Sequence, residues 1–341
     1  HEMKVRRGQQ RSQIRSRLGA FQHAVGEAVG PDERLDLGPA VAQTHGVGLL
    51  LQVGELAAGD LVAIDVRRAV PRRVVKRQVA GAHGLPEVGA VAERLLVVMR
   101  IALGVEYDGR RYRGWQAQDG EQTVQECLQQ AIARVADHPV RVTCAGRTDA
   151  GVHALGQVVH FDTGAQRRSH GWRLGISSFL PDDIAVPWAR EVGPEFDARF
   201  SATARHYRYL LLNRPVRPGL WSGRAGWTWK PLAVGPMQRA AGHWLGEQDF
   251  SSFRSAQCQA RHARRRLDRL AVRRHGDWVV FDVSANAFLH HMVRNLVGTL
   301  VVIGAGERQP DWARDVLVAR DRRCAGPTVE PGGLYLMAVD Y

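Results

Sequence analysis

The sequence has little lysine, few cysteines and no long apolar run. Only three of its 47 basic residues are lysines, and its four cysteines stand far apart, with no pair at the spacing CxxC. That spacing argues against a structural zinc site and against a disulfide framework. No stretch reaches the roughly 18 apolar residues that a membrane span requires, and residues 1–30 lack a signal-peptide core. We therefore expect a cytoplasmic protein with reduced thiols and no membrane association.

The charge balance points to an acidic partner. The chain has 341 residues, 45% of them hydrophobic, which is enough for two domains with packed cores and excludes disorder throughout. Its formal charge is +13, and +9 of this falls in residues 99–341. Clustered arginines neutralise phosphates and release counterions, so the surplus is typical of proteins that bind nucleic acid. The preference for arginine over lysine also fits GC-rich coding and is not read as functional by itself.

Residues 1–98 form an N-terminal extension that differs from the rest of the chain. They contain runs of Val, Ala, Gly and Arg without a sustained helical or alternating period, and they offer no chemistry. Position 1 is His, whereas Met99 directly precedes a strong predicted strand. We interpret the extension as a start codon assigned too far upstream. A flexible basic arm and a small independent domain are the alternatives.

From Met99 onward, strands and helices alternate. Thr123 and Glu126 form a capping box before an amphipathic stretch, and Asp137 to Pro139 end that helix. The pattern predicts strands at 101–107, 140–145, 157–161, 205–212, 266–273, 278–284 and 334–340, and further helices near 235–245, 289–303 and 310–320. Interleaved elements with hairpins predict an α+β fold, an antiparallel sheet covered by helices on one face, in two packed halves.

The loop Cys144 to Ala154 is the first candidate site. It places Arg147 and Asp149 two residues apart between glycines, which allow unusual backbone angles and the close approach of a ligand. A guanidinium beside a carboxylate keeps the carboxylate ionised and orients it. A tight turn with a local ion pair explains the same residues. The loop is not a Walker motif, because no Gly-Lys-Ser/Thr follows.

Two further segments combine arginine with aromatic residues. Residues 106–116 carry Arg113 in a glycine-containing loop, a mixture that suits unpaired RNA because rings stack on bases while arginine holds phosphates. An ordinary hairpin with buried rings fits equally well. In the predicted strand at 205–212, Arg205 and Tyr207 share one face. By itself Tyr207 reads as a core residue.

A third segment, residues 288–295, places His291 and Arg294 along one side of a helix start. We predict no metal at His290 and His291, because adjacent helical residues do not face each other and no third ligand stands at a suitable spacing. The basic run at 261–266 is usually a solvated face, although it is also a candidate for binding phosphates.

Seven segments, taken together and in this order, resemble the bacterial tRNA pseudouridine synthase A (TruA) family. They are YDGxxYxGWQ, QECLQQAI, AGRTDAGVHALGQVVHF, ARFSATARHYRY, LGEQDFSSFR, ANAFLHHMVRN and GLYLMAVDY. The similarity runs from Met99 to Tyr341, which is a full family domain, and the AGRTDAGVHA loop is highly specific to that family. Residues 1–98 match nothing in it.

The resemblance implies isomerisation of uridine to pseudouridine at positions 38 to 40 of the tRNA anticodon stem-loop, without metal or organic cofactor. It implies a homodimer of two-lobed α+β subunits related to the RNA-recognition fold, with lobes at 99–205 and 206–341. Asp149 matches the catalytic aspartate and nucleophile of the family, Arg147 its paired basic residue, and Tyr207 the tyrosine that contacts the base. We further expect Arg113, Arg205, His291 and Arg294 to bind the substrate RNA.

Two other functions fit part of the sequence. A non-catalytic tRNA-binding protein would show the same basic and aromatic segments, but it has no need for an ionised carboxylate that faces its anionic ligand. A glycosidase-like hydrolase could use Asp149, but the usual acid-and-base scheme requires a second carboxylate, and the motifs supply none.

Overall fold

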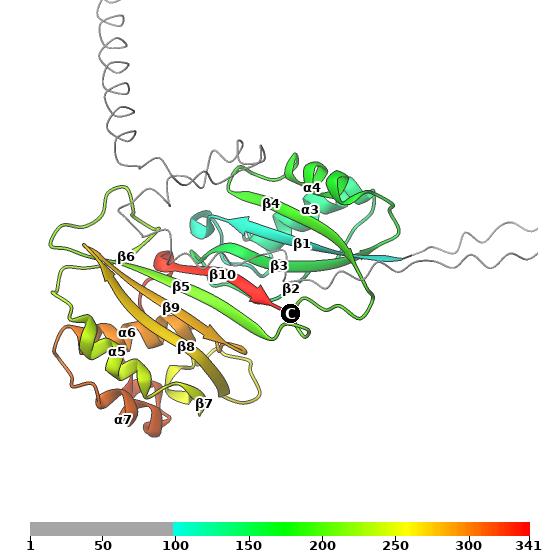
Figure 1. Ribbon diagram of the computed structural model, residues 1–341. Helices are drawn as coiled ribbons and strands as arrows, with labels where there is room; N and C mark the ends of the chain where they lie inside the picture. Colours follow the sequence, from blue (N-terminus) through cyan, green and yellow to red (C-terminus); the bar gives the residue numbers. More distant parts are fainter. Residues whose placement is uncertain (1–97) are drawn as a thin grey trace, which may run out of the picture. The chain divides into compact units, whose positions relative to one another are not determined.

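The structure, a computed structural model, describes residues 98–341 (Figure 1). Our interpretation of the N-terminal extension lies outside these residues, apart from its last position. Within the described part, the longest helices have 13 residues, fewer than the roughly 20 that cross a bilayer, and none is long and apolar enough to span a membrane.

One ten-stranded sheet organises the described chain. Its order is β4-β1-β3-β10-β5-β9-β8-β7, with β2 paired to β3 and β6 paired to β5. Neighbours are antiparallel except for β10 with β3 and β5 with β6. The strands are β1 (Met99–Tyr107), β2 (Thr143–Cys144), β3 (His153–Thr163), β4 (Ile184–Val192), β5 (Ala204–Asn213), β6 (Gly226–Thr228), β7 (Gly246–Asp249), β8 (Arg264–His275), β9 (Trp278–Ala285) and β10 (Leu334–Asp340).

Five helices accompany the sheet in two groups. In Figure 1, α3 (Val124–Ala136) and α4 (Ser169–Ser177) lie beside the β1, β3 and β4 half, while α5 (Val234–Gly242), α6 (Met292–Gly304) and α7 (Trp312–Ala319) lie beside β8 and β9. The predicted cap of α3 is present, since the Thr123 side chain accepts a hydrogen bond from the backbone N–H of Glu126. The helix ends at Asp137, which takes a left-handed conformation with φ of 61°.

The last strand of the chain lies in the middle of the sheet. Strand β10 pairs with β5 along most of its length and with β3 at Tyr335 and Leu336. The C-terminus therefore joins the first half of the described chain to the second. The predicted boundary between two lobes, at residues 205 and 206, falls inside β5, and the division stays a prediction.

The predicted α+β class is confirmed, but several elements differ from the prediction. The strand expected at 140–145 is reduced to β2, and the helix expected to end at Gly246 ends at Gly242. Gly246 has a φ of +85° and begins β7. No local signal predicted α4, whose first turn has no side-chain cap, or β4, an edge strand that contains Pro187.

A glycine fixes the loop that follows β2. Gly114 has a φ of +93°, and a Cβ added there would lie 2.8 Å from the Thr148 carbonyl oxygen and 3.1 Å from the carbonyl carbon of Asp149. The next backbone N–H, that of Trp115, donates to the Thr148 carbonyl at 3.0 Å. The loop can pack this closely on residues 114 and 115 only because position 114 has no side chain.

We predict that Gly114→Ala destabilises the protein more than Gly120→Ala. Both glycines have a positive φ, so both substitutions cost about 1 kcal/mol or more in backbone strain. Nothing lies within 4 Å of a Cβ at position 120, whereas the added methyl group at 114 meets backbone atoms, which costs about 1–3 kcal/mol more. Denaturant unfolding of the two variants measures the difference. Equal destabilisation would mean that the loop does not depend on this contact.

Candidate active site

The loop between β2 and β3 is held at several points, so its side chains are fixed against the sheet. The buried Gln157 side chain donates to the Gly146 carbonyl at 2.6 Å and accepts from the Gly146 N–H at 3.4 Å. The Thr148 hydroxyl hydrogen-bonds the Tyr107 hydroxyl at 2.8 Å in the interior. Val152 N–H donates to the Asp149 carbonyl at 3.1 Å and closes the turn. Asp149 therefore projects from a rigid loop.

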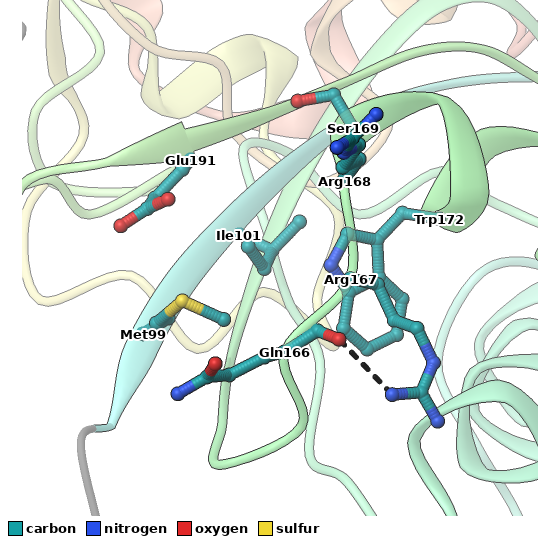
Figure 2. Close-up of a pocket in the computed structure, with 8 residues that line it drawn as sticks. All are labelled: Met99, Ile101, Gln166, Arg167, Arg168, Ser169, Trp172 and Glu191. Atoms are coloured by element: carbon teal, nitrogen blue, oxygen red, sulfur yellow. Dashed lines mark hydrogen bonds between the residues drawn. The ribbon is translucent and has the colours of Figure 1, made fainter.

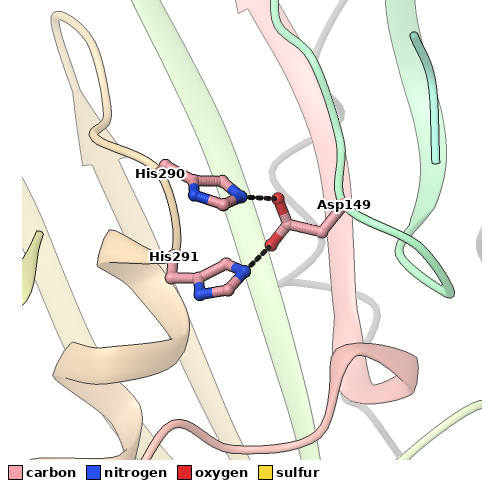
Figure 3. Close-up of side chains that lie close together, drawn as sticks. All are labelled: Asp149, His290 and His291. Atoms are coloured by element: carbon pink, nitrogen blue, oxygen red, sulfur yellow. Dashed lines mark ion pairs between the residues drawn. The ribbon is translucent and has the colours of Figure 1, made fainter. Parts of the chain in front are cut away.

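Three nitrogen groups from around the start of α6 meet the Asp149 carboxylate. Nη1 of Arg294 donates to Oδ2 at 3.1 Å. Nε2 of His290 lies 3.2 Å from Oδ1, and Nε2 of His291 lies 3.4 Å from Oδ2 (Figure 3). The side chain of Asp149 is only 20% exposed, so the arginine and the two imidazoles replace much of the water that the carboxylate loses.

Two adjacent histidines can face one carboxylate because of the backbone at His291. This residue precedes α6 and takes a left-handed conformation with φ of 63°. Leu289, before the two histidines, and Met292, after them, are buried and anchor the turn. The two rings lie side by side, with centroids 4.0 Å apart and planes at 33°. Our expectation that these two side chains do not face each other was wrong, because it assumed that both residues belong to the helix.

The surroundings keep Asp149 ionised. Burial alone raises the pKa of this carboxyl group, but the hydrogen bond from His290 and the charges of His291, His290 and Arg294 outweigh burial and lower the pKa below its usual value. Burial also lowers the pKa of His291, which favours its neutral form. The site thus combines a charged carboxylate with nearby groups that hold its orientation.

The cation paired with Asp149 is not the one that the sequence suggested. Arg147 is exposed, and within residues 98–341 the ion pairs of Asp149 involve only His290, His291 and Arg294. The predicted ion pair with Arg147 is therefore corrected to Arg294, whose Nε also donates to the Val329 carbonyl at 2.8 Å. The spacing of Arg147 and Asp149 was misleading because successive loop residues point in different directions.

Arg205 has a structural role rather than the phosphate contact that we predicted. It is 9% exposed, and its guanidinium makes five hydrogen bonds to main-chain carbonyl oxygens. The acceptors belong to four residues, Ala145, Arg199, Ala202 and Asn286. A guanidinium has five N–H donors, so none is left for a phosphate. Arg205 instead ties the start of the loop between β2 and β3 to the chain after β9.

Tyr207 lies beside the loop that carries Asp149, and its contact with the substrate base stays a prediction. It lies on β5 and is 8% exposed. Its ring packs edge-to-face with that of Phe288, with the ring centroids 5.1 Å apart. A Cβ added at Gly146 would lie 3.7 Å from its hydroxyl oxygen. Burial and then the negative charge of Asp149 raise the pKa of the Tyr207 hydroxyl. The ring therefore lies beside the loop and within electrostatic range of the carboxylate.

The remaining predicted residues divide into two groups. His291 and Arg294 meet Asp149, as described, while the side chain of Arg113 is exposed and forms an ion pair with Glu121 at 3.2 Å. Its RNA contact stays a prediction. The sequence analysis missed His290 as a partner of Asp149, because the left-handed turn at His291 that brings its imidazole to the carboxylate has no local sequence signal.

A separate hollow of about 500 Å³ lies between β1 and the start of α4 (Figure 2). It contains none of the groups around Asp149, and the lining residues are Met99, Ile101, Gln166, Arg167, Arg168, Ser169, Trp172 and Glu191. Nothing in its chemistry connects it to the carboxylate site.

Comparison with known proteins assigns the chain to a class of enzyme. The sequence pattern described as tRNA pseudouridine synthase matches residues 104–201 and 240–341. The chain therefore belongs to the tRNA pseudouridine synthase family, the isomerases that act on uridine in tRNA.

Within that family, the chain is similar to proteins named tRNA pseudouridine synthase A. It is 54% identical to the one from Nitrosococcus oceani over 71% of this chain and 94% of that protein. Identity is 55% with the one from Dechloromonas aromatica, covering 71% and 93%. A solved Cbf5-Nop10-Gar1 complex also matches over 69% of this chain and 57% of that one, but at 11% identity and a TM-score of 0.29 it carries no argument.

We predict that Arg205→Met strongly destabilises the fold. The substitution leaves buried carbonyl oxygens without their donors, at a cost of at least about 3 kcal/mol. Thermal unfolding measures this, with Arg113→Met as the control, which we expect to change stability by no more than about 0.5 kcal/mol because Arg113 is exposed. An Arg205→Met variant that is as stable as the parent but binds tRNA less tightly would restore the phosphate role.

Proposed function

We propose that the chain isomerises uridine to pseudouridine at positions 38 to 40 of the tRNA anticodon stem-loop, with Asp149 as the catalytic carboxylate. The observation that carries the proposal is the ionised, firmly held Asp149 in the loop that the family similarity covers. A protein that only binds RNA gains nothing from a negative charge next to a polyanion. A reaction that needs a nucleophile or a base explains why the charge is kept.

The chemistry requires access to both ribose and base. The bond between C1′ and N1 breaks, the uracil turns, and C5 joins C1′, so the nucleotide must leave the stack and enter the protein. The Asp149 carboxylate then attacks C1′ or removes a proton from the ribose. Either route needs a carboxylate that is charged before the substrate arrives, and Arg294 with the two histidines provides this.

The released uracil needs a surface that holds it while it turns. Tyr207 supplies an aromatic ring beside Asp149, with Phe288 packed on its edge. A base that stacks on this ring is retained without a fixed hydrogen-bond pattern, which suits a base that must rotate. We further propose that the Tyr207 hydroxyl assists loss of the proton from C5.

Basic residues position the RNA around the site. Arg113 is exposed near the loop and free to contact a phosphate once its ion pair with Glu121 opens. Arg147 is exposed on the catalytic loop itself, where it can occupy the space that the flipped base vacates. We propose further that the chain acts in the cytoplasm as a homodimer, the assembly implied by the family resemblance.

We predict that Asp149→Asn abolishes isomerisation while tRNA binding persists. The test is tritium release from C5-labelled uridine in unmodified tRNA, for which we expect a loss of about 10⁴-fold or more because the amide cannot act as the charged group. Binding should be retained or tightened, since a negative charge is removed. Release at the parental rate by the variant contradicts the proposal. Free uracil as the product would indicate a hydrolase, and binding without release by either protein would indicate an RNA-binding protein.

We also predict that Gly146→Ala impairs isomerisation without loss of stability. Its backbone has an ordinary conformation, and the added methyl group would touch only the Tyr207 hydroxyl, at 3.7 Å. The free protein should accept it, whereas a base between the loop and the ring should not, and we expect kcat/KM to fall about 10-fold or more. The control is Gly242→Ala, where nothing lies within 4 Å. Unchanged kinetics in Gly146→Ala would show that the base does not lie there.

A further inference from the structure

Two imidazoles and one carboxylate converge on a single point in the site. In the part of the chain that the structure describes, Asp149, His290 and His291 are the one group of three potential metal ligands whose ligand atoms all lie within 4.8 Å of one another. Both histidines present Nε2 toward the carboxylate, as Figure 3 shows.

The spacing of these atoms is compatible with a small transition-metal site. Ligand atoms placed tetrahedrally around zinc at about 2.0–2.1 Å are about 3.3–3.4 Å apart. Nε2 of His290 lies 3.2 Å from Oδ1 of Asp149, and one ligand atom from each of the three residues lies within 4.8 Å of the other two. Two histidines with one carboxylate, and a fourth position left for water, are a ligand set that zinc and similar ions accept.

We propose that the free enzyme binds one Zn²⁺ or a similar divalent transition-metal ion through His290, His291 and Asp149, and that this ion inhibits it. The ion would hold the carboxylate that the reaction needs, so the metal-bound and catalytically competent forms exclude each other. The binding rests only on the geometry. The inhibition rests in addition on the proposed role of Asp149.

Two features keep the affinity below that of a dedicated zinc site. Arg294 donates to Oδ2 of Asp149, so the ion binds Oδ1 and lies near a fixed positive charge. Nδ1 of His290 is buried without a hydrogen-bond partner, whereas a ligating histidine usually donates that N–H to a partner. Missing support of this kind weakens metal binding about 10- to 100-fold. The site therefore suits a reversible inhibitor rather than a permanent cofactor.

Direct binding is tested first, without RNA and without an activity assay. Co²⁺, which absorbs visible light when tetrahedrally bound, is titrated into the full chain, the double variant His290→Ala/His291→Ala and the control His170→Ala, which removes an exposed histidine. We expect one Co²⁺ per chain in the parent and the control, displaced by Zn²⁺, and affinity at least about 10-fold weaker in the double variant.

Three results would overturn the site. They are no Co²⁺ binding by the parent, binding unchanged in the double variant, and an absorption band showing cysteine ligation, for example by Cys258, whose Sγ accepts from the His290 N–H at 3.5 Å. If the double variant does not fold, as circular dichroism would show, His290→Gln replaces it, since it removes one imidazole and keeps a polar side chain.

The effect on activity separates this inference from the proposed function. Isomerisation by the parent should fall at least 10-fold when the site is filled with Zn²⁺ and recover when a chelator is added. Metal binding with undiminished isomerisation would contradict both the inhibition and the proposed role of Asp149, and would leave the metal site standing. Isomerisation without Co²⁺ binding would remove the metal site and leave the proposed function intact.

Discussion

The contact between Asp149 and Arg294 is the interaction on which the rest of the site depends. A carboxylate that is only 20% exposed loses much of its hydration, and an unpaired charge in such a place costs several kcal/mol. The two residues are 145 positions apart, so the fold must bring the loop after β2 to the first turn of α6. His290 and His291 complete the set around the carboxylate.

The fold holds these two segments, the loop after β2 and the start of α6, next to each other. Strand β10 pairs with both β3 and β5, so it connects the strand that follows the loop to the strand that carries Tyr207. Arg205 adds hydrogen bonds from β5 to the loop and to the chain beyond β9. The left-handed turn at His291 then directs both imidazoles back toward Asp149. Each of these contacts joins segments that are far apart in the sequence, and together they position the Asp149 carboxylate.

Features of the fold and the site could be predicted from the sequence where residues close together in the chain determine them. Periodicity and capping located α3, β1, β5, β9 and β10 closely, because these signals act over a few residues. The family resemblance led to Asp149 and Tyr207. The partner of Asp149 was predicted incorrectly because a loop spacing of two residues says nothing about side-chain direction. Arg205 was misread because five hydrogen bonds to the carbonyl oxygens of four residues, two of them 60 and 81 positions away, leave no trace in a linear pattern. The turn at His291 was missed because no glycine marks it.

These errors share a physical origin. Arginine and histidine serve equally well as ligands for phosphate and as structural partners for buried oxygens, and only burial and geometry decide between the two. In this chain the two most buried of the predicted RNA-binding arginines, Arg205 and Arg294, bind the protein itself. Arg113, the exposed member of that set, and the exposed Arg147, which we had predicted to pair with Asp149, are the better candidates for the substrate.

The most direct test of the account is a structure of the chain bound to an anticodon stem-loop whose target uridine carries fluorine at C5, which blocks loss of the C5 proton. The account predicts a flipped nucleotide, with Asp149 in contact with the ribose at C1′ or C2′ and the base against the ring of Tyr207. A nucleotide that remains stacked, or one that binds away from Asp149 while the carboxylate stays enclosed by Arg294 and the two histidines, would contradict it.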